Sequence, residues 1–254
     1  MSMPTIFVSH GSPTLILNDV PARGFLASLG RELPKPAAIV AVSAHWGTDV
    51  PAVSLARRPA TIHDFYGFPD ALYQLRYEAT GAPALAERVA GLTGAAHDPH
   101  RGLDHGAWVP ALLGWPEADI PIFQLSVQPD QSPAHHIALG RKLAPLRDEG
   151  VLVMGSGSAT HNLRALVRRG TSPEPEPWAK AFDDWLADAV ARGDEPALAE
   201  YRTRAPYAAE NHPSDEHLLP LHVAFGAAGE GARGRPLHRS FTLGNLSMAS
   251  YAFG

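Results

Sequence analysis

Cysteine is absent from this 254-residue sequence, and its absence removes whole classes of structure. Disulfide frameworks and thiolate metal sites are both excluded. Any metal must therefore be held by His, Asp or Glu, a donor set that suits hard to borderline divalent ions.

Long hydrophobic runs and concentrations of basic charge are missing as well. No stretch approaches the roughly 20 apolar residues that a membrane span needs, and the first ten residues lack the charge and apolar length of a signal peptide. The formal net charge of -5 offers no basic face for nucleic acid. We therefore expect a cytoplasmic enzyme with no nucleic-acid or membrane partner, and the oligomeric state is unknown from the sequence.

Familiar local catalytic motifs are also missing. There is no His-x-His or His-Glu-x-x-His pattern, which argues against the common zinc proteases. There is no Gly-x-Ser-x-Gly pattern, so a serine hydrolase has little support. What the sequence does contain is thirteen histidines, together with 24 prolines and 23 glycines that mark many turns between short elements.

Short apolar runs alternate with helical patterns along the whole chain. Strands are predicted at residues 5–9, 37–43, 120–127 and 151–154. Helices are predicted at residues 83–92, 133–146, 177–191 and 214–225, and one or two late strands at 239–243 and 246–251. Residues 227–235 are predicted to form an exposed loop and residues 172–177 a rigid connector. This order predicts a single α/β domain over residues 1–254, with a central mostly parallel or mixed sheet flanked by helices.

Three histidines directly follow predicted strands, namely His10, His45 and His161. Ligand sites of open α/β sheets lie beyond the carboxyl ends of the strands, so these side chains are expected to converge although they are far apart in sequence. A fourth candidate, His217, is predicted in the first turn of a helix beside Asp215 and Glu216. Those two acidic residues could equally be partners of the helix dipole.

The remaining histidines carry less information. His63 lies in an aromatic-rich loop that could border a planar substrate, and His105 precedes a helix. Asp104 could orient His105 or only cap that helix. His212 and His222 are undecided. The histidines that are predicted to lie at the surface are His97, His100, His135, His136 and His238.

Six motifs in consistent order, from residue 4 to about 250, resemble the 4,5-DOPA extradiol dioxygenase family of class III, LigB-like ring-cleaving enzymes. The motifs are Ser-His-Gly-Ser-Pro (9–13), Ser-Ala-His-Trp (43–46), Thr-Ile-His-Asp-Phe (61–65), Leu-Asp-His-Gly (103–106), Thr-His-Asn-Leu-Arg (160–164) and Glu-His-Leu-Leu-Pro (216–220). The resemblance implies a LigB-like fold, one divalent metal ion and no organic cofactor.

The resemblance also implies roles for individual residues. His10 and His45 would be metal ligands, with His217 as the third ligand and Glu216 as its alternative. His161 would be the acid/base histidine, or a fourth ligand. In the mechanism that we expect, His105 is a candidate to hydrogen-bond the bound oxygen species. A separate expectation is that His63 and Phe65 border the substrate ring.

The implied reaction is the opening of a catechol (DOPA-like) ring by O2, with Fe(II) for activity or Zn(II) in the same site. Family chemistry implies cleavage beside the two hydroxyls, giving a muconic semialdehyde. Two alternatives remain open at this point. One is a zinc-dependent hydrolase on a similar scaffold, and the other is a non-enzymatic binding protein of the Memo-like type.

Overall fold

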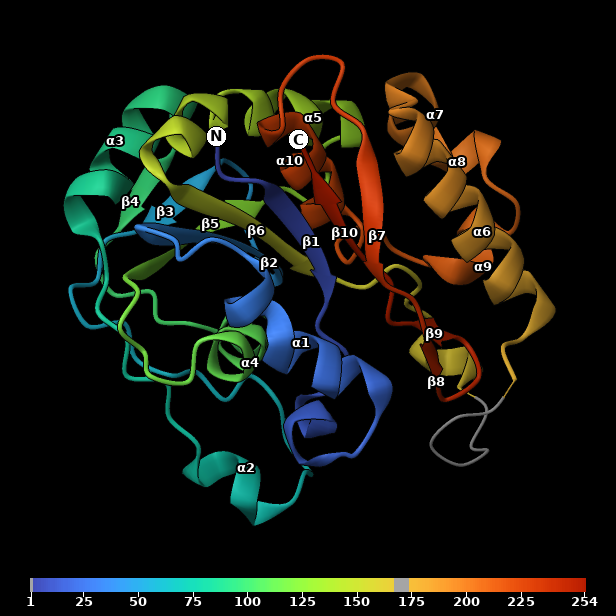
Figure 1. Ribbon diagram of the computed structural model, residues 1–254, viewed down its shortest axis with the longest axis horizontal. Helices are drawn as coiled ribbons and strands as arrows, with labels where there is room; N and C mark the ends of the chain where they lie inside the picture. The colour runs from blue at the N-terminus through green and yellow to red at the C-terminus, as the bar shows by residue number, and fades with distance from the viewer. Residues whose placement is uncertain (1, 167–173) are drawn as a thin grey trace.

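A central sheet of eight strands organises the computed structural model, which describes residues 2–166 and 174–254 (Figure 1). The spatial order is β4-β3-β5-β2-β6-β1-β10-β7. The strands are β1 (Thr5–Ser9), β2 (Ala38–Gly47), β3 (Ala52–Ser54), β4 (Ala96–Asp98), β5 (Ile122–Val127), β6 (Val151–Gly157), β7 (Gly234–His238) and β10 (Ser250–Phe253). The central pairs β5-β2, β2-β6 and β6-β1 are parallel, whereas β10 and β7 add antiparallel strands at one side. The predicted single α/β domain with a mixed sheet is confirmed.

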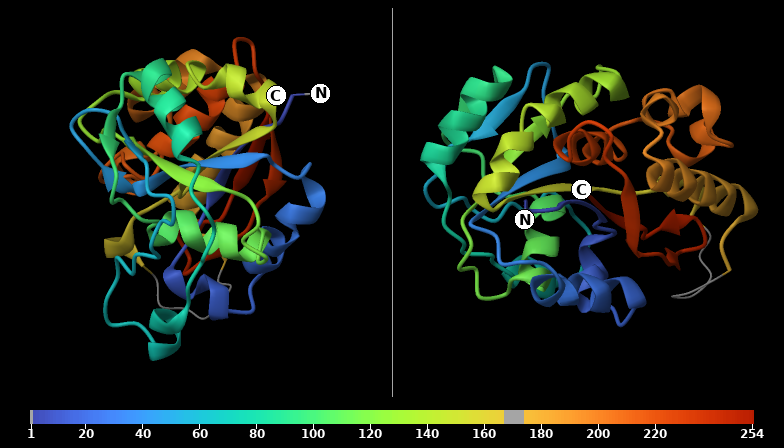
Figure 2. Two further views of the ribbon diagram at one scale, coloured as in Figure 1. Left: turned by 90° about the vertical axis from the view of Figure 1, so that its left-hand side faces the viewer. Right: turned by 45° about the horizontal axis from the view of Figure 1, so that its top comes forward.

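Helices cover both faces of this sheet, as the edge-on view in Figure 2 shows. One face carries α1 (Pro21–Glu32) and α4 (His105–Gly114). The other carries α3 (Pro83–Thr93), α5 (Pro133–Arg141) and α10 (Leu219–Ala227). Beside β7 lie α6 (Pro177–Arg192), α7 (Glu195–Ala199), α8 (Tyr201–Arg204) and α9 (Ala208–Asn211). The short α2 (Asp70–Gln74) and the small hairpin of β8 (Phe241–Thr242) and β9 (Leu246–Ser247) lie outside these layers.

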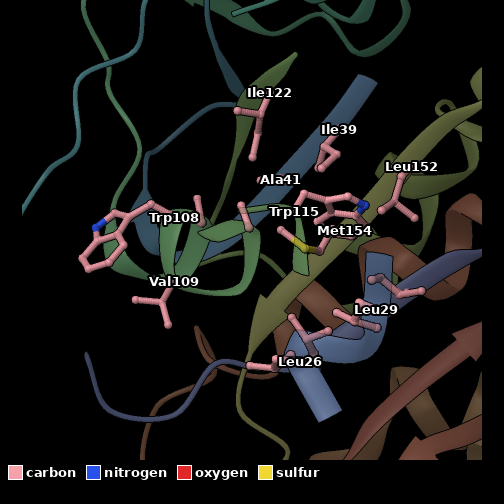
Figure 3. Close-up of a cluster of buried hydrophobic side chains, with 14 of the residues drawn as sticks. Leu26, Leu29, Ile39, Ala41, Trp108, Val109, Trp115, Ile122, Leu152 and Met154 are labelled. Atoms are coloured by element: carbon pink, nitrogen blue, oxygen red, sulfur yellow. The ribbon is translucent and has the colours of Figure 1, made fainter. Parts of the chain in front are cut away.

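The alternation of side chains along β2 explains why its sequence is apolar throughout. Ile39 and Ala41 pack toward α1 and α4, in the cluster drawn in Figure 3, while Val40 and Val42 pack toward α3, α5 and α10. All four are fully buried. A strand that is covered on both faces needs hydrophobic residues at every position, as the parallel central strands of α/β folds do.

Two predicted helices have different bounds, and proline explains both differences. The helix predicted at 133–146 ends at Arg141 and is followed by a 3-10 turn at Ala144–Glu149. Pro145 lacks an N–H group and disfavours helical geometry at the residue before it. The helix predicted at 214–225 begins only at Leu219, because Pro220 belongs in a first turn.

Other differences lie at the edges of elements. The strand predicted at 37–43 continues to Gly47, so His45 lies within β2 near its end. The Gly-rich segment predicted as a loop ends where β7 begins, at Gly234. Residues 172 and 173 of the predicted connector lie outside the described residues. No helix in the described ranges is both long and apolar enough to cross a membrane.

Candidate active site

Five histidines meet around one cavity of about 400 Å³ at the carboxyl end of the central strands. His10 follows β1, His45 lies near the end of β2, and His161 follows β6, so all three are at the strand ends where the sequence pattern predicts them. His217 arrives from the turn before α10, and His105 is the first residue of α4. The cavity is within the range of roughly 300–1,000 Å³ that small-molecule sites occupy.

His10 and His45 direct one ring nitrogen each at a common point, since their Nε2 atoms are 3.0 Å apart. The other nitrogen of His10, Nδ1, lies 3.0 Å from the Ser156 hydroxyl. That hydroxyl donates its proton to the carbonyl of Gly106 at 2.5 Å, so its oxygen accepts from His10 Nδ1–H. This fixes the tautomer of His10, and the lone pair of Nε2 faces the cavity.

His217 reaches the cluster because the chain around it packs against a glycine. Its carbonyl accepts from Ser158 N–H at 2.9 Å, and a Cβ atom on Gly157 would lie 2.0 Å from that carbonyl oxygen. The ring nitrogen Nδ1 of His217 lies 2.9 Å from the Glu216 carboxylate. Glu216 therefore orients the ring in the way that carboxylates orient metal-binding histidines in other proteins.

His161 stacks on His217, with ring centroids 3.4 Å apart and planes inclined by 11°. Ring-nitrogen lone pairs lie in the plane of the ring. Two nearly parallel rings that lie face to face therefore cannot both aim a lone pair at one ion. This stacking favours the acid/base role expected for His161 over the fourth ligand position.

Asp64 binds His105 twice, although no pattern in the sequence pointed to a role for this residue. One carboxylate oxygen accepts from His105 Nδ1–H at 2.9 Å, and the other accepts from the His105 backbone N–H at 2.9 Å. The same carboxylate lies 3.7 Å from Nδ1 of His45. Asp104, by contrast, caps α4 by accepting from Ala107 N–H. The alternative that Asp104 orients His105 is wrong, because Asp64 does so.

The electrostatics of the cluster favour neutral imidazoles at His10, His45 and His217. Burial, followed by the neighbouring histidines, lowers the pKa of His10 and His217 well below the usual value. Burial and His105 lower the pKa of His45 to about 3 although Asp64 opposes the shift. Burial raises the pKa of the Asp64 carboxyl, but the hydrogen bonds from His105 outweigh it and the net pKa is about 2. Lone pairs are therefore available at neutral pH beside an ionised carboxylate.

The two residues expected to border a substrate ring lie at different depths. Phe65 lines the cavity together with Phe68. His63 lies behind it, with its ring edge-on to Phe65 at 5.6 Å and its Nε2 3.1 Å from the carbonyl of Leu75. The structure therefore brings Phe65 to the site, whereas His63 supports Phe65 from outside the cavity lining.

The donor set fits one divalent ion. Two nitrogens that each lie about 2.1 Å from an ion are about 3 Å apart at a right angle, which matches the pair His10 and His45. Potential ligand atoms of His10, His45 and His105 lie within 4.8 Å of one another, and so do those of His161, Glu216 and His217. His105 thus joins the candidates for the third position, a possibility that the sequence argument did not include.

Three further histidines are buried away from this cavity. His136, predicted at the surface, is fully buried, and that prediction is wrong. Its Nε2 accepts from Gln128 N–H at 3.0 Å while Nδ1–H donates to the Ser132 carbonyl at 2.9 Å. The undecided His212 and His222 are also fully buried and bond to backbone carbonyls. None of the three lines the cavity.

Comparison with known proteins assigns the chain to a family. Residues 4–254 match the family described as the catalytic LigB subunit of aromatic ring-opening dioxygenase. A 4,5-DOPA dioxygenase extradiol of Beta vulgaris is 47% identical, covering 98% of this chain and 96% of the relative. A protein of the same name from Escherichia coli K12 is 40% identical, covering 99% and 95%. The crystal structure of an uncharacterized protein from Escherichia coli K12 aligns with a TM-score of 0.82 at 34% identity, covering 99% of this chain and 100% of that chain.

The family, the relatives and the histidine cluster agree, and neither a hydrolase nor a Memo-like binding protein is favoured. The chain belongs to the LigB family of aromatic ring-opening dioxygenases.

Proposed function

We propose that this protein opens a catechol ring with O2 on the extradiol side, at one divalent metal held by His10, His45 and His217. The observation that carries the proposal is the 3.0 Å approach of two imidazole nitrogens, His10 Nε2 and His45 Nε2, in a pocket where burial lowers the pKa of His10, His45 and His217. The names of the relatives, which specify DOPA, support a catechol as substrate.

The choice of His217 as third ligand rests on what its neighbours do. Glu216, the alternative, is bonded to the outer nitrogen of His217 at 2.9 Å and so serves as an orienting partner. His105 has a carboxylate partner of the same kind in Asp64, so the family resemblance, which gives His217 as the third ligand, leaves His105 to face the substrate. Three neutral imidazoles leave the full 2+ charge of the ion to meet a catecholate.

The side chains around the metal would manage protons. A bound divalent ion supplies charge that lowers the pKa of the catechol hydroxyls, and Fe(II) additionally supplies electrons for reduction of O2. Burial lowers the pKa of His161, so its ring is neutral at pH 7 and can accept a proton at a ring nitrogen. His105, with Nδ1–H held by Asp64, presents the lone pair of Nε2 to the cavity, where it can accept a hydrogen bond from a catechol hydroxyl. Phe65 packs against the aromatic ring, and His63 supports Phe65.

Imidazole ligands accept both Fe(II) and Zn(II). We propose Fe(II) as the active ion, because only iron changes oxidation state. The test is O2 uptake with a panel of catechols, DOPA included, after anaerobic loading with Fe(II) or Zn(II). We expect equimolar consumption of O2 and catechol by the iron form only. Ester or amide hydrolysis by the zinc form, with no O2 uptake by the iron form, would favour a hydrolase instead. The expectations of a cytoplasmic location and of no nucleic-acid partner stay predictions.

A further inference from the structure

The cavity has two chemically different halves. The histidines form one half, and carbon-rich side chains form the other. The apolar half consists of Phe65, Phe68, Leu163, Leu166, Leu243 and Leu246. Within the described part of the chain, histidines are the only titratable side chains in this lining. A catechol whose hydroxyls face the histidines would therefore direct the rest of the molecule at apolar surface.

Leu243 contributes to this wall from an unfavourable backbone conformation. Its φ is +53°, in the left-handed region that non-glycine residues rarely adopt, and the next residue, Gly244, has a φ of +82°. Glycine at position 243 would adopt the same turn without this cost. Strained conformations of this kind concentrate at ligand-binding sites, where the surrounding structure enforces them. Of the three non-glycine residues with positive φ in the described part of the chain, Leu243 is the one whose side chain lines the cavity.

The hairpin that carries Leu243 is fastened to the segment that carries His161. Thr160 Oγ1 donates to the Asn245 carbonyl at 2.7 Å and accepts from Ser247 N–H at 2.6 Å. The Asn245 side chain donates to the Asn162 carbonyl at 2.8 Å. These bonds flank His161 on both sides, so the wall formed by β8 and β9 is held in a fixed position relative to the reacting ring.

A second apolar space adjoins the first behind this wall. This smaller cavity, of about 140 Å³, shares Leu243 and Leu246 with the main cavity and continues to Leu15, Val20 and Met248. A ring substituent that reaches the hairpin would thus contact apolar side chains in the main cavity and, beyond Leu243 and Leu246, in the smaller one.

We propose that the β8–β9 hairpin forms a subsite for an uncharged, apolar ring substituent, so that the chain prefers alkyl- or aryl-substituted catechols over catechols bearing an amino acid group. This inference rests on the proposed catechol chemistry and narrows its substrate class. The physical reason is desolvation, since an ammonium or carboxylate group in this half of the cavity would lose water without gaining an ionic partner from the described residues that line it.

The first test compares 4-propylcatechol with DOPA, because the two differ mainly in charge at a similar substituent length. For the Fe(II)-loaded enzyme we expect a kcat/KM at least tenfold higher for 4-propylcatechol. Anaerobic calorimetry on the same protein measures binding of both compounds independently of turnover. Equal or tighter binding of DOPA would overturn the subsite. Preferential binding of 4-propylcatechol without any O2 uptake would support the subsite and overturn the proposed reaction.

The second test removes the side chain without disturbing the turn. Leu243→Gly keeps the positive φ and should fold at least as stably, yet it should lower the ratio of kcat/KM for 4-propylcatechol to that for unsubstituted catechol by about tenfold. Ala118→Gly is the matched control, because Ala118 also has a positive φ, of +51°, and lies outside the cavity lining. That variant should keep the wild-type ratio. An unchanged ratio in Leu243→Gly would refute the subsite.

Discussion

The substitution Asp64→Asn tests whether the Asp64 carboxylate determines which ring nitrogen of His105 carries the proton. In the wild type both carboxylate oxygens accept, one from His105 Nδ1–H and one from the His105 backbone N–H, each at 2.9 Å. Asparagine offers one oxygen and one NH2 group at the same two positions. If the oxygen keeps the backbone bond, the NH2 group faces Nδ1 and forces the proton of His105 to Nε2. If the oxygen instead accepts from Nδ1–H, the NH2 group of the asparagine faces the backbone N–H of His105, and two donors lie opposite each other.

Either outcome disturbs His105, which faces the cavity. His10 keeps its hydrogen bond to Ser156, and His217 keeps its hydrogen bond to Glu216. Loss of an outer partner of this kind typically costs 10- to 100-fold in activity, or about 1.4–2.7 kcal/mol in the barrier. We therefore expect kcat to fall by that factor, with KM for catechol and bound metal nearly unchanged. The assay combines O2-electrode kinetics with elemental analysis of the Fe(II)-loaded protein. Asp49→Asn, at an exposed position, is the matched control.

A kcat within twofold of wild type for Asp64→Asn would refute this reasoning. Loss of bound metal together with the loss of rate would also refute it. That result would mean that Asp64 orients the proposed ligand His45, whose Nδ1 lies 3.7 Å from the carboxylate.

Three further predictions concern the other histidines. His217→Ala should lose bound metal, whereas Glu216→Gln should retain most of it; elemental analysis decides, and full retention by His217→Ala would move the third ligand to His105 or Glu216. His161→Phe should keep the metal and lose about 100- to 10,000-fold in kcat, as removal of an acid/base group does, and loss of metal would instead make His161 a ligand. Burial lowers the pKa of His136, His212 and His222 to about 4, so the unfolded chain takes up protons first as the pH falls below 6.5. Each of these three histidines should lower the free energy of unfolding by about 2 kcal/mol between pH 7 and pH 5. A melting temperature of the metal-free protein that does not change over this range would contradict the lowered pKa values.

The convergence of His10, His45 and His161 could be predicted because the ends of the strands can be recognised in the sequence. The apolar runs before His10, His45 and His161 each end within a few residues of the histidine, and the carboxyl ends of neighbouring parallel strands lie together whatever their separation along the chain. That geometric rule brings three histidines together without knowledge of any contact.

Other parts of the site depend on contacts that no local pattern encodes. Asp64 is 41 residues from His105, and only the folded loop brings its carboxylate to the start of α4. The burial of His136 was likewise unreadable, because its partners are the backbone groups of Gln128 and Ser132. The start of α10 was predictable in principle, since Pro220 is typical of a first helical turn.

The central claim is that one divalent ion sits among imidazoles that come from separate strands, and the bound-metal content of His10→Ala tests it most directly. The wild-type protein should bind one Fe(II) per chain after anaerobic loading, and the variant should bind essentially none and consume no O2 with any catechol. A variant that keeps one ion per chain and full turnover would contradict the account.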